Sequence, residues 1–316
     1  MTIREHVLLL AGGVGGAKLA LGLSEVLPAG NLTVIVNTAD DFQHLGLHVS
    51  PDLDTVMYTL AGIANPETGW GLQGDTLQAM EMVKRCGGPD WFNLGDRDIG
   101  TNLMRSYWLR KGLSLTEVTR KLSSALDVKQ TILPMTDSPV NTVMECDQGM
   151  LPFQEYFVKE RWQPIVKAIH FQGAEDSTPS PDVISALERA TLIVIAPSNP
   201  LLSIDPILAV PQIRSLIKGH TVPRVAVSPI IGGQAVKGPA AKLMGELGIE
   251  VSPVGVSDYY AGLIDGILFD IADEVYLPKI EALGLKASLQ TTIMKTKSDK
   301  IHLAEILLHW TEENLS

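Results

Sequence analysis

The amino-acid sequence predicts an α/β fold: a doubly wound, mostly parallel, Rossmann-like sheet that carries an α+β insertion. Apolar strands alternate with helices at both ends of the chain, as they do in doubly wound sheets. The run Thr33–Val36 is typical of a parallel strand that is buried on both faces. Between the two ends, residues 63–186 follow a different pattern, which indicates an insertion into the sheet domain.

The N-terminal elements form one strand–helix–strand unit. Val7–Leu10 is the first predicted strand, and Lys18–Val26 is a predicted helix that Pro28 ends. Thr33–Val36 is the second strand. The crossover between two parallel strands of one sheet is right-handed, so the helix is expected to cover one face of the sheet.

The C-terminal part repeats this alternation. We expect strands at Thr191–Ala196, Arg224–Ser228, Glu250–Val254 and Gly284–Thr292. We expect helices at Pro211–Lys218, Pro239–Leu247 and Lys297–Trp310. Residues 1–62 and 187–316 are therefore predicted to form the Rossmann-like core.

The insertion, residues 63–186, is expected to mix helices with β structure. Helices are predicted at Ile99–Leu109 and Leu115–Leu126. Ser114 and Glu117 have the spacing of a capping box at the start of the second helix. Residues 130–172 are predicted to be mainly β structure.

Composition and charge exclude several classes of protein. The chain has 316 residues, 45% of them hydrophobic, which is enough for a sizeable core. A net charge of −11 argues against a nucleic-acid partner. No apolar run has the length that spans a membrane, and no secretion signal is expected at Val7–Leu10. With only Cys86 and Cys146, both expected to be reduced, we expect a cytoplasmic protein.

The most informative segment is a glycine-rich turn between the first strand and the first helix. Gly12, Gly13, Gly15 and Gly16 lack the β-carbons that would keep a phosphate away from the backbone, and a helix N-terminus favours anions. Lys18 stands where a dinucleotide-binding motif has its third glycine, which argues against NAD. The glycines are predicted to bind a phosphate outside the dinucleotide enzymes. A tight turn without a ligand is the alternative.

Aspartates follow the second strand and open the next predicted helix. Asp40 comes after Thr33–Val36, at the sheet edge where ligands bind in α/β proteins. Ser50 is expected to be a helix N-cap, so that Asp52 and Asp54 lie about 200° apart around the helix and face different sites. Carboxylates beside a phosphate need a cation, and we expect Mg²⁺ at Asp40 and Asp54. Complementing the helix dipole is the alternative role.

Three further clusters follow predicted strands or open a helix. Arg97, or Arg105 further along the same helix, is a candidate for contact with a phosphate, with helix capping and local ion pairs as the alternative. Ser198 and Asn199 follow a buried strand and suit contact with a base or a phosphate. The segment Ser228–Gly233 repeats this arrangement after the next strand.

These motifs together resemble a known family. Six segments occur in order: Leu10–Gly16, Asn37–Asp41, Ser50–Thr55, Leu94–Asp98, Ala196–Pro200 and Ser228–Gly232. The set resembles the 2-phospho-L-lactate transferase family (CofD) of coenzyme F-420 biosynthesis over nearly the whole chain. The gluconeogenesis-factor family of sugar-nucleotide-binding regulators shares the glycine turn and a following Asp-Asp pair, and a regulator of that kind is the alternative function.

The resemblance implies a Mg²⁺-dependent transferase. It implies 7,8-didemethyl-8-hydroxy-5-deazariboflavin as acceptor and a guanosine diphosphate-linked lactate, or its enolpyruvate counterpart, as donor, with release of GMP. The family contacts the deazaflavin through the second Asp of Pro-Asp-Leu-Asp, here Asp54. It has a further contact, often Lys, just before Leu-Gly-Asp-Arg-Asp, here Asn93.

The motifs do not assign the catalytic base, the donor or the assembly. Asp54 or Asp40 is the candidate base for the hydroxyl proton, and one residue cannot easily be both base and tight metal ligand. The sequence does not separate the phospholactyl from the phosphoenolpyruvyl donor. We expect a homodimer, with the apolar segment Leu263–Phe269 as a candidate surface.

Overall fold

A computed structural model describes residues 2–315, and a seven-stranded sheet runs through its centre. Its strand order is β14-β13-β10-β9-β1-β2-β5, and every neighbouring pair is parallel. The strands are β1 (Val7–Ala11), β2 (Leu32–Val36), β5 (Thr131–Pro134), β9 (Leu192–Ile195), β10 (Arg224–Val227), β13 (Gly266–Asp270) and β14 (Lys286–Gln290). The predicted doubly wound α/β fold is confirmed.

The sheet separates two hydrophobic cores. Every residue of β1 is buried, and alternate side chains enter opposite cores, with Leu8 and Leu10 in one and Val7 and Leu9 in the other. This alternation follows from the two-residue period of a strand. Burial on both faces explains why the strand has no polar side chain.

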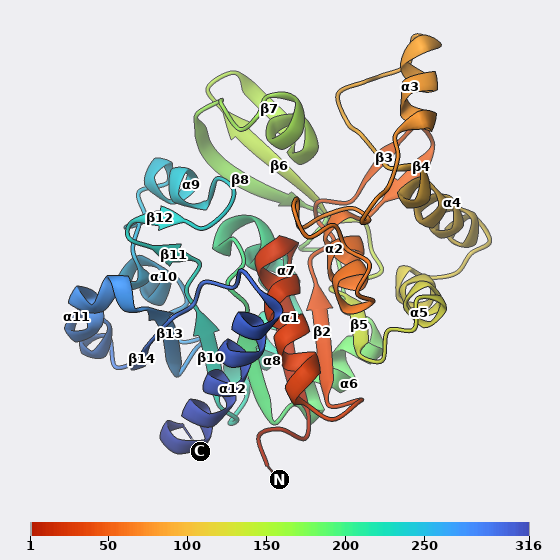
Figure 1. Ribbon diagram of the computed structural model, residues 1–316. Coiled ribbons are helices and arrows are strands. Elements are labelled where there is room, and N and C mark those ends of the chain that lie inside the picture. The colour runs from red at the N-terminus through yellow and green to blue at the C-terminus, as the bar shows by residue number, and fades with distance from the viewer. Residues whose placement is uncertain (1, 316) are drawn as a thin grey trace.

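Helices cover both faces of the sheet (Figure 1). The core that contains Leu9 is covered by α1 (Gly13–Val26), α2 (Pro51–Leu60), α5 (Leu115–Ala125) and α12 (Lys297–Asn314). The core that contains Leu8 is covered by α6 (Pro181–Arg189), α7 (Asp205–Ala209), α8 (Pro211–Gly219), α9 (Ala240–Glu246), α10 (Pro253–Tyr259) and α11 (Leu277–Ala282). No helix within residues 2–315 has both the length and the apolar character needed to cross a membrane.

Several of the remaining elements gather at one end of the molecule, away from the two chain termini (Figure 1). They include a hairpin of β3 (Phe42–His44) and β4 (Leu47–Val49), with α3 (Gln78–Arg85) and α4 (Asp96–Arg110). A separate antiparallel sheet holds β6 (Asn141–Cys146), β7 (Gly149–Pro152) and β8 (Val166–Gln172). Shorter elements are β11 (Ile230–Ile231), β12 (Gln234–Ala235), η1 (Glu155–Lys159), η2 (Pro200–Ile204) and η3 (Ile271–Tyr276).

Two expectations about local structure were wrong. The first helix begins at Gly13 and not at Lys18, so the glycines after Gly12 form its first turns. The segment Glu250–Val254 is not a strand, because Pro253 opens α10 and the Ser252 hydroxyl accepts the backbone N–H of Gly255. A serine followed by proline is a helix start signal that outweighs a short apolar run.

The strand expected near Glu250 is provided instead by β13 (Gly266–Asp270), which pairs with β10 and β14. The segment Leu263–Phe269 is consequently not an exposed surface. Its apolar side chains are buried inside the chain, so they are not available to a partner. The expectation that this segment offers a dimer surface was therefore wrong.

The insertion is interrupted by one strand of the central sheet. β5 lies within residues 63–186 but pairs in parallel with β2 at the sheet edge. The capping box of Ser114 and Glu117 at the start of α5 is confirmed. The division into a core of residues 1–62 and 187–316 and an insertion stays a prediction.

Candidate active site

One cavity of about 550 Å³ lies where the carboxyl ends of the central strands meet. Gly12, Asp40, Ser198 and Ser228 follow β1, β2, β9 and β10 respectively, and all four line it. The motifs that the sequence placed after separate strands therefore do converge on one site. This is the position at which open α/β sheets bind their ligands.

The glycine turn is packed tightly against neighbouring segments of the chain. A β-carbon added to Gly15 would lie 2.2 Å from the carbonyl oxygen of Pro197, and one added to Gly12 would lie 2.5 Å from Oδ2 of Asp52. Gly13 has a φ of +59°, a conformation that favours glycine. Close approach within the protein is thus one physical reason for these glycines, whether or not a phosphate also contacts them.

Ser198 and Asn199 form hydrogen bonds that hold the turn after β9 in place. The Ser198 hydroxyl donates to the carbonyl of Gly12 at 2.7 Å and accepts its N–H at 3.3 Å. Oδ1 of Asn199 accepts the backbone N–H groups of Leu201 and Leu202. Both residues line the cavity, and both also hold its wall in place.

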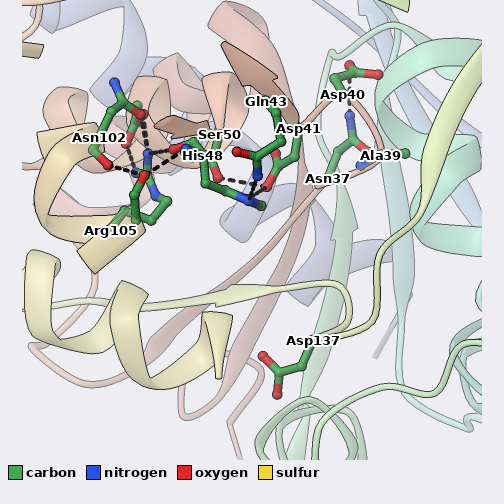
Figure 2. Close-up of polar contacts among 12 residues, drawn as sticks. Asn37, Ala39, Asp40, Asp41, Gln43, His48, Ser50, Asn102, Arg105 and Asp137 are labelled. Atoms are coloured by element: carbon green, nitrogen blue, oxygen red, sulfur yellow. Dashed lines mark hydrogen bonds and ion pairs between the residues drawn. The ribbon is translucent and has the colours of Figure 1, made fainter. Parts of the chain in front are cut away.

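Asp40 and Asp52 are buried next to each other and share one hydrogen-bond donor. Nδ2 of Asn37 donates to Oδ2 of each at 3.0 Å. Figure 2 shows Asn37 beside Asp40. Burial raises the pKa of Asp52 to about 6, against the hydrogen bonds from Asn37 and the Gly13 backbone. Burial, and then the charge of Asp52, hold the pKa of Asp40 well above its usual range. The two carboxyls therefore resist carrying two negative charges at once.

Asp52 and Asp54 line the same cavity, so the expectation that they face different sites was wrong, although each has a different partner. Arg105 on α4 donates to both carboxylate oxygens of Asp54, with Nη1 lying 3.0 Å from Oδ2. Nη1 also donates to Oδ1 of Asn102 at 2.5 Å (Figure 2). Because Arg105 is only 1% exposed and paired in this way, it is not a free cation for a phosphate.

Ser50 occupies the expected position before α2 but does not cap it. Pro51 is the first helical residue, as predicted, yet the Ser50 hydroxyl donates to Oδ2 of Asp41 at 2.7 Å. The same oxygen lies 3.1 Å from Nε2 of His48. Asp41 therefore ties the β3–β4 hairpin to the start of α2, next to the site.

Asp98 is a site residue that the sequence had only suggested as a helix cap. It lines the cavity, and its Oδ1 accepts the Tyr58 hydroxyl at 2.7 Å. Burial and the nearby charge of Asp54 raise the pKa of Asp98 to about 7. This carboxyl therefore exchanges a proton near neutral pH. The sequence held one indirect signal for this residue. Asp54 and Tyr58 are spaced by about one helical turn, which places both on one side of α2, so the residue that contacts Tyr58 lies near Asp54.

Two aspartates cap the helices α3 and α4 reciprocally: the one that precedes α3 caps α4, and the one that begins α4 caps α3. Asp75 accepts the backbone N–H groups of Arg97 and Asp98 at the start of α4. Asp96 accepts those of Gln78 and Ala79 at the start of α3. The alternative role for this cluster was capping of α4, by Asp96 and Asp98. The fold brings Asp75 close, and Asp75 supplies that cap instead.

The two remaining candidates differ in position. Asn93 lines the cavity. Arg97 is exposed and does not line the cavity, because its guanidinium turns to the carbonyl of Gln73 and lies 3.8 Å from Asp75. In this structure Arg97 is therefore not placed to contact a ligand in the cavity.

Aromatic side chains form the wall beside Asn93, a feature missed by the sequence analysis. Trp91 and Phe92 line the cavity and pack against the β3–β4 hairpin. The rings of Phe42 and Phe92 meet edge to face with centroids 4.8 Å apart. Trp70 lines the cavity from another loop. Such a wall suits a planar aromatic ligand.

The carboxylates differ in how well they fit a magnesium ion. No group of three His, Cys, Asp or Glu side chains within residues 2–315 is placed to hold a metal ion. Oδ1 of Asp40 is buried without a hydrogen bond, although the Thr142 hydroxyl lies nearby. A single carboxylate oxygen of this kind fits Mg²⁺, which takes most of its ligands from substrate and water. Asp54 fits less well, since Arg105 already neutralises both of its oxygens.

Comparison with known proteins gives a consistent result. The model of the family described as 2-phospho-L-lactate transferase CofD matches residues 7–305. A 2-phospho-L-lactate transferase of Methanosarcina mazei is 42% identical, covering 96% of this chain and 99% of that protein. A phosphoenolpyruvate transferase of Streptomyces griseus is 41% identical, covering 98% of this chain and 99% of its own length.

A solved structure shares the fold. The crystal structure of a Bacillus halodurans protein superimposes with a TM-score of 0.65, covering 96% of this chain and 99% of that one. Its sequence is 18% identical, so the likeness extends to the architecture alone.

Proposed function

The chain belongs to the 2-phospho-L-lactate transferase CofD family, and from this premise we propose the reaction that its cavity carries out. The family and its relatives support a transferase role in coenzyme F-420 biosynthesis. The proposed acceptor is 7,8-didemethyl-8-hydroxy-5-deazariboflavin, and the proposed donor is a three-carbon acid joined to guanosine through a diphosphate. The family match favours this enzyme over a nucleotide-sugar-binding regulator.

In the proposed reaction the terminal ribityl hydroxyl attacks the phosphorus that carries the three-carbon acid. A new P–O bond forms, the bond from that phosphorus to the bridging oxygen breaks, and GMP leaves with the bridging oxygen. The hydroxyl proton passes to a carboxylate of the protein. Reactions of this kind depend on positioning and charge neutralisation more than on a covalent intermediate.

One observation carries the proposal: a single cavity joins an aromatic wall, four aspartates and the glycine turn. The wall of Trp91 and Phe92 suits the flat deazaflavin ring. Asp54 lines the same cavity as this wall and the start of α1, which suits contact with the ribityl chain. Burial raises the pKa of Asp54, and the charge of Arg105 opposes that rise. Arg105 fixes the position of the carboxylate, whose free lone pairs can accept a hydroxyl hydrogen.

We propose that the donor lies along the glycine turn. Gly12, Gly13, Gly15 and the turn of Ser198 and Asn199 line that part of the cavity. Gly16 is buried behind them, where a β-carbon would meet Ser198 Oγ at 2.7 Å. Its role is therefore to let α1 pack closely against the turn after β9.

Asp40 is the proposed magnesium ligand. When bound, Mg²⁺ would neutralise charge on the donor phosphates. Asn37 orients Asp40 through its shared hydrogen bond, and Gln154 donates to the backbone carbonyl of Asp40 at 3.0 Å. These contacts fix the carboxylate in place before any ligand arrives.

Mass spectrometry of the product made from each donor tests the proposal. The purified protein, deazaflavin and Mg²⁺ are mixed with either the lactyl or the enolpyruvyl guanosine diphosphate donor. We expect GMP release and a product mass that identifies one preferred acid, since relatives of both names are about equally similar. Binding of a UDP-sugar without turnover of deazaflavin by either donor would favour the regulator instead. The proposed cytoplasmic location and homodimer need separate measurements.

A further inference from the structure

Two lysines line the same cavity as the aspartates. Lys18 lies on α1, and Lys237 lies in the segment between β12 and α9. Within residues 2–315, neither ammonium group pairs with a carboxylate. The protein thus keeps two uncompensated cations at its cavity although its net charge is −11.

The two ammonium groups lie on the same side of α1. A β-carbon added to Gly69 would lie 2.6 Å from Cγ1 of Val14 and 3.5 Å from Nζ of Lys237. Lys237 therefore reaches the face of α1 that carries Val14. Lys18 follows Val14 by one helical turn and shares that face.

The pKa of each ammonium group is lowered. Burial lowers the pKa of Lys18. Burial, and in addition the charge of Lys18, lower the pKa of Lys237. Two cations that line one cavity are stabilised when an anion binds between them.

Both ammonium groups have hydrogen-bond donors to spare. Lys237 donates to the backbone carbonyl of Thr68. An ammonium group has three donors, so two remain. Lys18 makes no hydrogen bond to any residue in the part of the chain that the structure describes, 2–315.

The start of α1, by contrast, already has internal acceptors for some of its donors. Asp52 accepts the N–H of Gly13, and Ser198 accepts that of Gly12. Asp52 also brings negative charge to this helix end, which works against a phosphate there. The positive charge available to an anion lies one turn further on, at Lys18.

We propose that Lys18 and Lys237 form a subsite for a phosphoryl group, whose anionic oxygens bridge the two ammonium groups. The subsite rests on the proposed function only for the identity of its ligand, the diphosphate of the guanosine-linked donor. In the sequence, Lys18 marked only the departure from a dinucleotide motif, and Lys237 only followed the glycines of Ser228–Gly233.

Calorimetric titration of the full chain with GDP, GMP and guanosine tests the subsite. The variants are Lys18→Gln and Lys237→Gln, with Lys286→Gln on the edge strand β14 as a control that removes one exposed charge outside the cavity. Each cavity variant is expected to weaken GDP binding about tenfold. Guanosine affinity should stay unchanged, and the control should match the wild type with all three ligands.

Charge and folding are checked separately. Lys18→Arg keeps the charge and should retain most of the GDP affinity, while the unfolding midpoint of every variant should stay near that of the wild type. Undiminished GDP affinity in both glutamine variants would overturn the proposal. So would an equal loss for guanosine, or a wild-type protein that binds guanosine as tightly as GDP.

The subsite and the transfer reaction can fail independently. A protein that binds GDP through the lysines but releases no GMP with deazaflavin and donor would contradict the transfer function and leave the subsite intact. The converse outcome is also possible. If the wild type transfers normally, and the lysine variants keep its KM for the donor and its GDP affinity, the subsite is refuted and the transfer function stands.

Discussion

Arg105 and Asp54 form a bidentate ion pair inside the protein, and their side chains are only 1% and 8% exposed. The pair joins α4 to α2 across the wall of the cavity. A buried pair of this kind costs much solvation and adds little net stability, but it fixes the position and the charge of each partner. Here it holds Asp54 in place at the cavity surface, and the charge of Arg105 opposes the rise in the pKa of Asp54 that burial causes.

Arg105→Met is expected to destabilise the protein by about 3–5 kcal/mol, because it leaves the Asp54 charge buried without a partner. Urea unfolding measures the change. The matched control is Arg120→Met, which breaks an ion pair with Asp182 whose side chains are 64% and 48% exposed. That variant should lose only about 0–1 kcal/mol. Equal losses of unfolding free energy in the two variants would show that burial does not increase the cost of breaking the Asp54 pair.

Asp54→Asn is expected to lower the rate of GMP release by about 10²-fold or more, because the amide cannot accept the ribityl proton. The amide oxygen can still accept a hydrogen bond from Arg105, so the variant should stay folded. Assays with saturating deazaflavin separate the loss of rate from a loss of binding. Asp182→Asn, at the surface, serves as the control. A fully active Asp54→Ala variant would refute the assignment.

Asp98 makes a specific contribution to the pH dependence of stability. Its pKa is raised to about 7 in the folded protein, so between pH 4 and 7 the folded state binds the proton more strongly than the unfolded state. The contribution is fully present below the pKa of an unfolded aspartate, about 4, and is lost as pH rises through about 7.

The free energy of unfolding should therefore fall with rising pH across this range more steeply in the wild type than in Asp98→Asn. Urea unfolding at several pH values measures both proteins, and their difference isolates Asp98 from the other carboxyls. The hydrogen bond from Tyr58 can be kept by the amide oxygen. Parallel pH curves for the two proteins would contradict the raised pKa.

Asp40→Asn is expected to raise the Mg²⁺ concentration needed for half-maximal GMP release by about tenfold or more, because it weakens a hard oxygen ligand. Chelation of Mg²⁺ should stop the reaction of the wild type. Asp41→Asn is the control, since Asp41 is the adjacent carboxylate and does not line the cavity. If both variants need the same Mg²⁺ concentration as the wild type, Asp40 is not the ligand.

The strands and helices that could be predicted are those with strong local signals. The fully apolar run of β1 and the capping box of α5 depend on neighbouring residues alone. Glu250–Val254 was misread because a short apolar run fits a strand and a buried helix equally well. The serine and proline within it were the better signal.

The site was predicted in position but not in its contacts. The rule that parallel strands end at one edge was enough to bring Asp40 and Ser198 together. The pairing of Asp54 with Arg105, and the cap that Asp75 gives to α4, depend on how a distant helix docks. No spacing within the sequence encodes that docking. Arg97 was therefore expected near the ligand, whereas Asp75 and the Gln73 carbonyl hold it outside.

Gly15→Ala tests whether the glycine turn exists for close packing. The added β-carbon would lie 2.2 Å from the Pro197 carbonyl oxygen, which belongs to backbone and cannot swing aside. Either α1 or the turn after β9 must shift, and such overpacking typically costs about 1–3 kcal/mol. Because Gly15 on α1 and Ser198 and Asn199 on the turn all line the cavity, either shift changes its wall, and GMP release should fall as well.

Gly100→Ala is the matched control, since Gly100 lies within α4 and its added β-carbon meets nothing within 4 Å. There the change should stabilise the protein by about 0.5–1 kcal/mol through the higher helix propensity of alanine. Urea unfolding and the rate of GMP release are measured for both variants. If Gly15→Ala is also stabilising and fully active, the contact with Pro197 does not constrain the turn, and phosphate binding remains the reason for glycine there.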